Sequence, residues 1–181
     1  MKQKILVLVA AVLGVLVLNI FIPPLSLKEG DIVFQISESS QSPFIVAATK
    51  SPWSHCGVII EKEDGLYVLE ASNKVKLTPY KEWRDRGFMK IVSKRRVTDE
   101  PIKIKYSKYL NTPYDLEFKF NNGKYYCSEL VWDIYEKQFG ISIGTPHNIS
   151  DYNITNDKIK KLMKKRNISN DQLIISPADI K

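Results

Sequence analysis

The chain has 181 residues, a length typical of one domain, and its hydrophobic content of 44% is ordinary for a globular protein. Its two cysteines, Cys56 and Cys127, and its two histidines, His55 and His147, match no ligand spacing of a structural zinc site. The composition therefore argues against a metal centre, and we expect a domain that needs no metal or organic cofactor.

Residues 1–24 differ from the rest of the chain. Lys2 and Lys4 precede an apolar run over 5–22, and a basic start followed by such a run is typical of a secretory signal. The run is just long enough to span a hydrocarbon core. Because no cleavage site of small residues is evident, we favour an uncleaved membrane anchor over a cleaved signal peptide. In both cases residues 25–181 are exported and face the periplasm or another extracytoplasmic space.

The domain alternates between strand and helix patterns. We expect strands over 30–36, 53–61, 66–72 and 88–96, a short helix or loop within 37–49, a helical turn over 80–86 anchored by Trp83, and a helix from Pro101 to Leu110. A loop at 121–123, a helix from Cys127, a basic helix near 158–166 and a closing segment over 173–180 follow. Strands grouped in the middle with helices around them indicate an α+β fold.

Much of the net charge of +7 lies in the segment 158–166, which is rich in lysine. The simplest interpretation is the solvated face of a helix whose buried side carries Ile159, Leu162 and Met163. An anionic membrane or envelope polymer is the alternative ligand for these charges. We do not expect a nucleic-acid partner, because an exported protein rarely meets one.

Cys127 stands where an amphipathic helix is expected to begin. Leu130, Ile134 and other apolar residues recur at helical spacing, and Gly140 follows where a helix end often needs a positive φ. The first turn of a helix lies at the positive end of its dipole, which favours thiolate, the nucleophilic form of cysteine. Cys127 is therefore a candidate nucleophile. The alternative is a small buried cysteine that packs a helix start.

His55 and Glu70 are expected on one face of a β-hairpin. If residues 62–65 form the turn, Glu61 pairs with Leu66, and Glu70 becomes the same-face diagonal neighbour of His55. A tighter Asp64-Gly65 turn would instead slide the two apart. A carboxylate in a mostly apolar strand needs a partner, so the hairpin predicts a His–Glu pair. A glutamate on a solvated strand face is the alternative.

The remaining cysteine and histidine receive structural interpretations. Cys56 follows His55, so its side chain is expected on the opposite strand face, filling the core. A Cys56–Cys127 disulfide would abolish nucleophilic chemistry, and we disfavour it because that face points the wrong way. His147 lies in a loop and is expected at the surface.

The order His55, Glu70, Cys127, within Ser-His-Cys-Gly-Val and Tyr-Cys-Ser-Glu-Leu-Val, resembles a circularly permuted form of the NlpC/P60 cysteine peptidases, and more narrowly the YiiX/YebB-like hydrolases. The Thr-Pro-Tyr segment ending at Tyr114 resembles the family's Pro-Tyr segment before the nucleophile. The resemblance implies a permuted papain-like fold, with an antiparallel central sheet or small barrel packed against the cysteine helix. Tyr126 replaces the aspartate that precedes the cysteine in unpermuted members.

The resemblance also implies roles. Cys127 is the nucleophile, His55 its base, and Glu70 the group that orients His55. The Cys127 backbone N–H, with the Tyr114 hydroxyl as a possible second donor, stabilises the oxyanion, and Tyr126 is a further candidate for oxyanion or substrate contact. We expect an envelope hydrolase that cleaves an amide or ester in a peptide, amino-acid-containing or acyl-lipid substrate through a thioester. The alternative is an idle envelope module that binds an amino acid, peptide or lipid head group.

Overall fold

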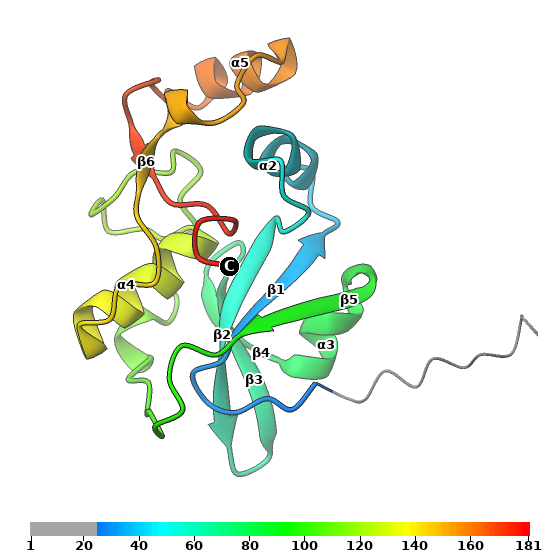
Figure 1. The fold of residues 1–181 in the computed structure, drawn as a ribbon, viewed down its shortest axis with the longest axis vertical. Coiled ribbons are helices and arrows are strands. Elements are labelled where there is room, and N and C mark those ends of the chain that lie inside the picture. The colour runs from blue at the N-terminus through cyan, green and yellow to red at the C-terminus, as the bar shows by residue number, and fades with distance from the viewer. Residues whose placement is uncertain (1–24) are drawn as a thin grey trace, which may run out of the picture.

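The computed structural model describes residues 25–181 (Figure 1). The membrane anchor or signal peptide expected at residues 1–24 lies outside the described residues. Within residues 25–181, no helix combines the length and the apolar character needed to cross a membrane.

A five-stranded antiparallel sheet forms the centre of the fold, in the order β4-β3-β2-β1-β5. Its strands are β1 (Ile32–Ser37), β2 (His55–Lys62), β3 (Gly65–Ala71), β4 (Val75–Pro79) and β5 (Gly87–Arg95). Consecutive strands β1 to β4 are neighbours, and β5 returns to pair with the free edge of β1. Four of these strands agree with the sequence prediction, and so does the mixed architecture with an antiparallel sheet.

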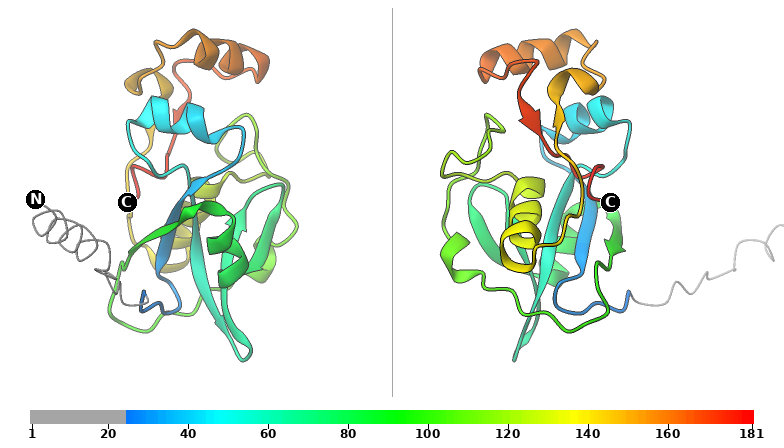
Figure 2. Two further views of the ribbon diagram at one scale, coloured as in Figure 1. Left: turned by 90° about the vertical axis from the view of Figure 1, so that its right-hand side faces the viewer. Right: turned by 60° about the vertical axis from the view of Figure 1, so that its left-hand side comes forward.

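The helices are α2 (Ser42–Thr49), α3 (Tyr80–Asp85), α4 (Cys127–Phe139) and α5 (Asp157–Lys165), with short 3-10 turns at Ser107–Tyr109 and Ile149–Asp151. Two short strands, β6 (His147–Asn148) and β7 (Leu173–Ile174), form a separate pair. Both figures place α2 and α5 together at one end of the molecule, while the β2–β3 hairpin extends from the other end (Figures 1 and 2).

Alternation along the strands divides the buried residues between the two faces of the sheet. Val58 and Ile60 of β2 belong to the main core, which includes Leu130 and Ile134 of α4. Ile59, on the opposite face, joins a smaller core around Trp83 of α3. The helix that carries Cys127 and the helix that carries Trp83 therefore cover opposite faces of the sheet.

A third, satellite core lies under α5. Its buried members are Ile149, Ile159 and Met163, and Phe44 and Ala48 of α2 pack against it. This cluster is separate from the main core. Helices α2 and α5 thus form a cap, a name we use below for these two helices, whose packing is largely its own.

The helix predicted from Pro101 to Leu110 is wrong. Residues 101–106 have no regular secondary structure, and only a 3-10 turn over Ser107–Tyr109 follows. The N–H of Ile104 donates to Glu29 Oε1 at 2.9 Å, and that of Lys105 donates to Gln138 Oε1 at 2.9 Å, so they do not form helical bonds. Apolar residues at every second position match this extended course better than a helix.

Candidate active site

Cys127 is the first residue of α4 and is 3% exposed. Two neighbours fix this helix start against the closing segment of the chain: the Ile175 N–H donates to the Tyr126 hydroxyl at 3.1 Å, and the Ser128 hydroxyl donates to the Ile175 carbonyl at 2.7 Å. At its other end the helix stops at Gly140, whose φ of 66° confirms the expected glycine cap. The sulfur thus lies at the positive end of a well-anchored helix dipole.

The β2–β3 hairpin has the expected register, with Glu61 opposite Leu66. One further pair, Lys62 with Gly65, closes it, so the alternative slipped register is excluded. Gly57 and Glu70 come one residue beyond the last pair, Val58 with Leu69, and a Cβ on Gly57 would lie 3.4 Å from the Glu70 Cβ and 2.8 Å from the Leu69 carbonyl oxygen. The missing side chain leaves room for the diagonal contact between His55 and Glu70.

His55 Nε2 lies 2.7 Å from Glu70 Oε2, in a buried pair. Thr78 of β4 donates its hydroxyl to Glu70 Oε1 at 2.6 Å, and Arg86, just after α3, forms an ion pair with the same carboxylate. Glu70 is fully buried. Burial alone would raise its pKa, but His55 and Arg86 outweigh this and lower the pKa of Glu70 to about 2.

The imidazole of His55 has two polar partners, Glu70 and Cys127. Its ring lies 6.0 Å from that of Trp83, at an angle of 32°. Burial lowers the pKa of His55, but Cys127 and Glu70 outweigh burial and raise it to about 9. Since Nε2 faces Glu70, Nδ1 is the nitrogen left for the Cys127 sulfur.

Cys56 is a second neighbour of the Cys127 sulfur. A hydrogen bond from Cys56 and the charge of His55 hold the pKa of Cys127 well below its usual range, although burial opposes them. Burial and the Cys127 charge raise the pKa of Cys56, so this thiol stays protonated and donates. The expectation that Cys56 points away from Cys127 is wrong, because its strand face is the one that α4 covers. Both cysteines are free.

The two tyrosines chosen from the sequence occupy different positions. The backbone of Tyr114 is held by two contacts. Its N–H donates to the Asn73 carbonyl at 3.2 Å, and Tyr114 forms an isolated β-bridge with Tyr125. Burial and the Cys127 charge raise the pKa of Tyr114 well above its usual range, so its hydroxyl keeps its proton and can donate. The hydroxyl of Tyr126 instead accepts a hydrogen bond from the Ile175 N–H, and Tyr126 also lines the cavity beside Cys127.

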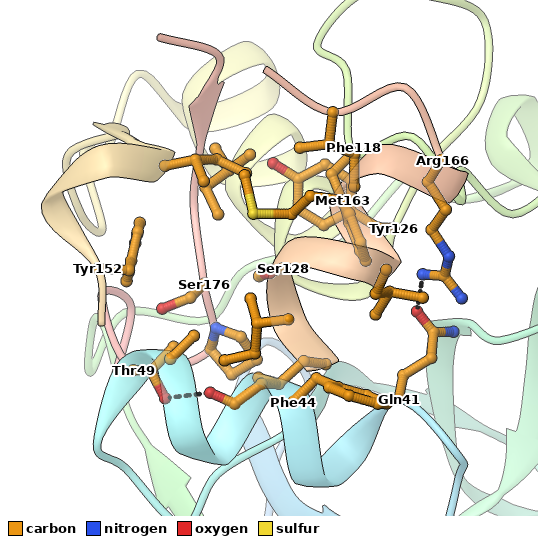
Figure 3. A pocket seen from close by; sticks show the side chains of 18 of the residues that line it. Gln41, Phe44, Thr49, Phe118, Tyr126, Ser128, Tyr152, Met163, Arg166 and Ser176 are labelled. Carbon is orange, nitrogen blue, oxygen red and sulfur yellow. Dashed lines mark hydrogen bonds between the residues drawn. The ribbon is translucent and has the colours of Figure 1, made fainter. Parts of the chain in front are cut away.

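Two hollows of opposite character meet at this site. An almost wholly apolar cavity of about 110 Å³ lies between the cap and Cys127. Figure 3 shows Phe44 of α2 on one side of it and Met163 of α5 on the other. A more polar cleft of about 400 Å³ is lined by His55, Arg86 and several serines. Gln41, Ile45 and Tyr114 line both, so they form the wall between the two hollows.

Sequence reasoning did not find Thr78 and Arg86. Val75 and Leu77 alternate with polar residues, which is the signal of a strand and could have revealed β4, the one strand of the central sheet that was not expected. No sequence pattern of this kind identifies Arg86, because its contact with Glu70 depends on how α3 packs. His147 is exposed, as expected, but it lies in the short strand β6 and not in a loop, and it lines neither hollow.

The residues around Cys127 do not resemble a metal centre. In the part of the chain that the structure describes, no group of three or more His, Cys, Asp or Glu side chains is placed to hold an ion. Both oxygens of Glu70, the nearest carboxylate to His55, already accept hydrogen bonds from protein donors.

A permuted papain-like hydrolase is the class of protein that a helix-borne cysteine and a preceding His–Glu hairpin define. The chain belongs to the family described as permuted papain-like amidase enzyme, YaeF/YiiX, C92 family, whose model matches residues 26–179. The match confirms the narrower resemblance noted from the sequence, to the permuted YiiX/YebB-like hydrolases, and shows that the broader NlpC/P60 name is slightly off.

Two comparisons with single proteins agree with this family. The chain is 33% identical over 160 residues to YiiX of Escherichia coli K12, described as an uncharacterized protein, covering 83% of this chain and 79% of the relative. A crystal structure of YiiX from Escherichia coli O157:H7, described as a metalloprotein, matches with a TM-score of 0.78 and 33% identity, over 84% of this chain and 91% of that one.

Proposed function

We propose that this protein is a cysteine hydrolase that cleaves an amide or ester between an aliphatic acyl group and a polar leaving group. The observation that carries the proposal is the position of the two hollows. The nucleophile Cys127 borders the apolar cavity, whereas the base His55 borders the polar cleft. In acyl transfer the acyl group stays on the nucleophile, and the leaving group departs from the side of the acid that protonates it.

The reaction begins with Cys127 as thiolate and His55 as imidazolium. The sulfur attacks the substrate carbonyl carbon, and the oxygen becomes an oxyanion that the Cys127 backbone N–H and the Tyr114 hydroxyl stabilise. The carbon–nitrogen or carbon–oxygen bond then breaks, and His55 gives its proton to the leaving group. A thioester remains on Cys127, and neutral His55 removes a proton from the water that hydrolyses it.

Glu70 acts through His55. Its charge stabilises the imidazolium, and its hydrogen bond at Nε2 keeps Nδ1 directed towards the sulfur. Thr78 and Arg86 in turn hold the carboxylate ionised and in place. These two are positioning residues rather than groups that touch the substrate.

The lining of the apolar cavity suits the acyl chain of a lipid better than a peptide without large apolar side chains. Ile45, Ala48, Ile159 and Leu162 line the cavity with aliphatic groups, and the one charged lining residue, Arg166, is paired with Gln41 at its edge. We place this activity at the cell envelope, on the basis of the basic start and apolar run of residues 1–22. Peptides with large apolar side chains are the second substrate class that the cavity would admit.

The test is hydrolysis of p-nitroanilides and p-nitrophenyl esters whose acyl chains range from two to twelve carbons, in a series of about four lengths. We expect kcat/KM to rise with chain length, because each buried methylene contributes about 0.8 kcal/mol. Intact-mass measurement on mixing should detect the acyl group on Cys127, and Cys127→Ala should abolish both signals. A full-length enzyme that hydrolyses none of these substrates and never acquires an acyl group would leave only an idle binding module.

Adjacent alanines on α2 give a matched control for the cavity. Ala48 borders the cavity and Ala47 is exposed. We expect Ala48→Phe to lower kcat/KM for the long chains by about tenfold or more while sparing the two-carbon substrate. Ala47→Phe should leave the length dependence unchanged. Equal effects of the two variants would contradict the assignment of the cavity to the acyl group.

A further inference from the structure

The outward face of α5 carries charge that nothing in the domain uses. Residues 157–166 contain six basic side chains and one acidic one. Its five lysines are exposed: Lys158, Lys160, Lys161, Lys164 and Lys165. Within residues 25–181, none of the five forms an ion pair. Like charges this close repel one another, so the lysines do not stabilise the helix. Its buried face and its N-cap stabilise it instead.

That other face is the roof of the acyl cavity. Ile159 and Met163 are buried in the satellite core, and Leu162 also lines the cavity. The Asn156 side chain caps the helix by accepting from the Lys158 N–H at 2.8 Å. One helix thus presents lysines outward and, one side-chain layer below, borders the apolar cavity that reaches Cys127.

We propose that the lysine face of α5 docks on an anionic phospholipid bilayer and brings the mouth of the cavity to the lipid surface. Clustered lysines on an amphipathic helix are attracted to the negative surface potential of such a membrane. The exposed face of α5 offers no aromatic ring for base stacking, which disfavours single-stranded nucleic acid. An acyl chain that leaves the bilayer at this point meets an apolar cavity instead of water.

The two helices of the cap meet at the edge of the cavity. The satellite core of the cap is separate from the main core, and one polar contact, from Arg166 to Gln41 Oε1 at 2.7 Å, joins the end of α5 to the start of α2. Figure 3 shows this contact at the edge of the cavity. The membrane-binding inference does not require the proposed chemistry, because lipid binding depends on α5 and not on Cys127.

The experiment is lysine footprinting of the full chain. An acetylating reagent is added with phosphatidylglycerol vesicles, with phosphatidylcholine vesicles or without lipid, and each lysine is read by peptide mass spectrometry. We expect labelling of the α5 lysines to fall at least threefold with phosphatidylglycerol only and to recover at high salt, since the attraction is screened. Lys105 and Lys124, which are also exposed and unpaired in the described chain, should label equally in all three.

Charge reversal supplies the second arm. Lys161→Glu with Lys164→Glu should abolish the extra binding to phosphatidylglycerol over phosphatidylcholine vesicles, measured by flotation, and Lys105→Glu with Lys124→Glu, which change the net charge equally, should not. Cys127→Ala must retain the footprint, so failure of the hydrolase proposal is distinguishable. Equal α5 labelling in all vesicles would overturn the inference, as would protection by a soluble polyanion such as heparin without any protection by phosphatidylglycerol.

Discussion

Replacement of Glu70 by glutamine should both destabilise the domain and weaken the nucleophile. The carboxylate is fully buried and has its pKa lowered from 4.5 to about 2, by His55 and Arg86 against the effect of burial. The difference corresponds to about 3 kcal/mol of preference for the ionised form in the folded state. Because the folded pKa is the lower one, this stability is present above pH 4.5 and is lost as the pH falls from 4.5 towards 2.

The thermal readout follows from that free energy. For a chain of this size about 1 kcal/mol shifts the melting temperature by about 2–4 °C, so Glu70→Gln should melt about 6–12 °C lower at pH 7. The deficit should shrink as the pH falls from 4.5 towards 2, where wild type also becomes protonated. Glu63→Gln, in the exposed turn of the same hairpin, is the matched control and should melt like wild type.

The chemical readout is the pH dependence of Cys127 alkylation by iodoacetamide. Glu70 helps to raise the pKa of His55 to about 9, and the imidazolium in turn lowers the pKa of Cys127. Loss of the carboxylate should therefore move the thiolate transition of Cys127 upward by about one pH unit or more, a tenfold loss of rate below it. A variant with the wild-type alkylation profile and melting temperature would refute this reasoning.

Three other substitutions test separate parts of the fold and site. Gly57→Ala should cost about 1–3 kcal/mol in urea unfolding, because its Cβ would lie 2.8 Å from the Leu69 carbonyl oxygen. Burial raises the pKa of Glu129 from 4.5 to about 8. The ionised carboxylate therefore destabilises the fold increasingly as the pH rises from 4.5 to 8. Glu129→Gln should melt higher than wild type at pH 9 but not at pH 4. Tyr114→Phe should lower kcat by about 10²–10³ without changing the alkylation rate of Cys127, whereas equal losses in both would remove Tyr114 from the oxyanion site.

The hairpin geometry was predictable because short-range rules determine it. Strand alternation and turn length place Glu70 beside His55 before any fold is known, and Gly57 marks the space between them. The Cys127 helix was also predictable from local sequence, because its apolar spacing and Gly140 indicate where it begins and ends. That the hairpin meets this helix came from family resemblance and not from the pattern, because a contact between segments so distant in sequence has no local signature.

The errors have a common physical origin. The extended segment after Pro101 is fixed by bonds to the side chains of Glu29 and Gln138, which are far away in sequence. Cys56 was assigned to the correct strand face, but which face α4 covers depends on tertiary packing. Arg86 reaches Glu70 for the same reason. Local periodicity predicts where a side chain points but not what it meets there.

The separation of the three cores has a consequence for how this site can vary. His55 and Glu70 depend on the sheet and on the core around Trp83, while the start of the Cys127 helix depends on the main core. The cap that roofs the cavity packs in its own cluster. If the cavity holds the acyl group as we propose, substitutions in the cap should change which acyl groups fit without disturbing the pKa of Cys127 or His55. On the proposed function, acyl preference could then change in this chain while the reacting groups stay fixed, because the cap and the reacting groups are held by different sets of contacts.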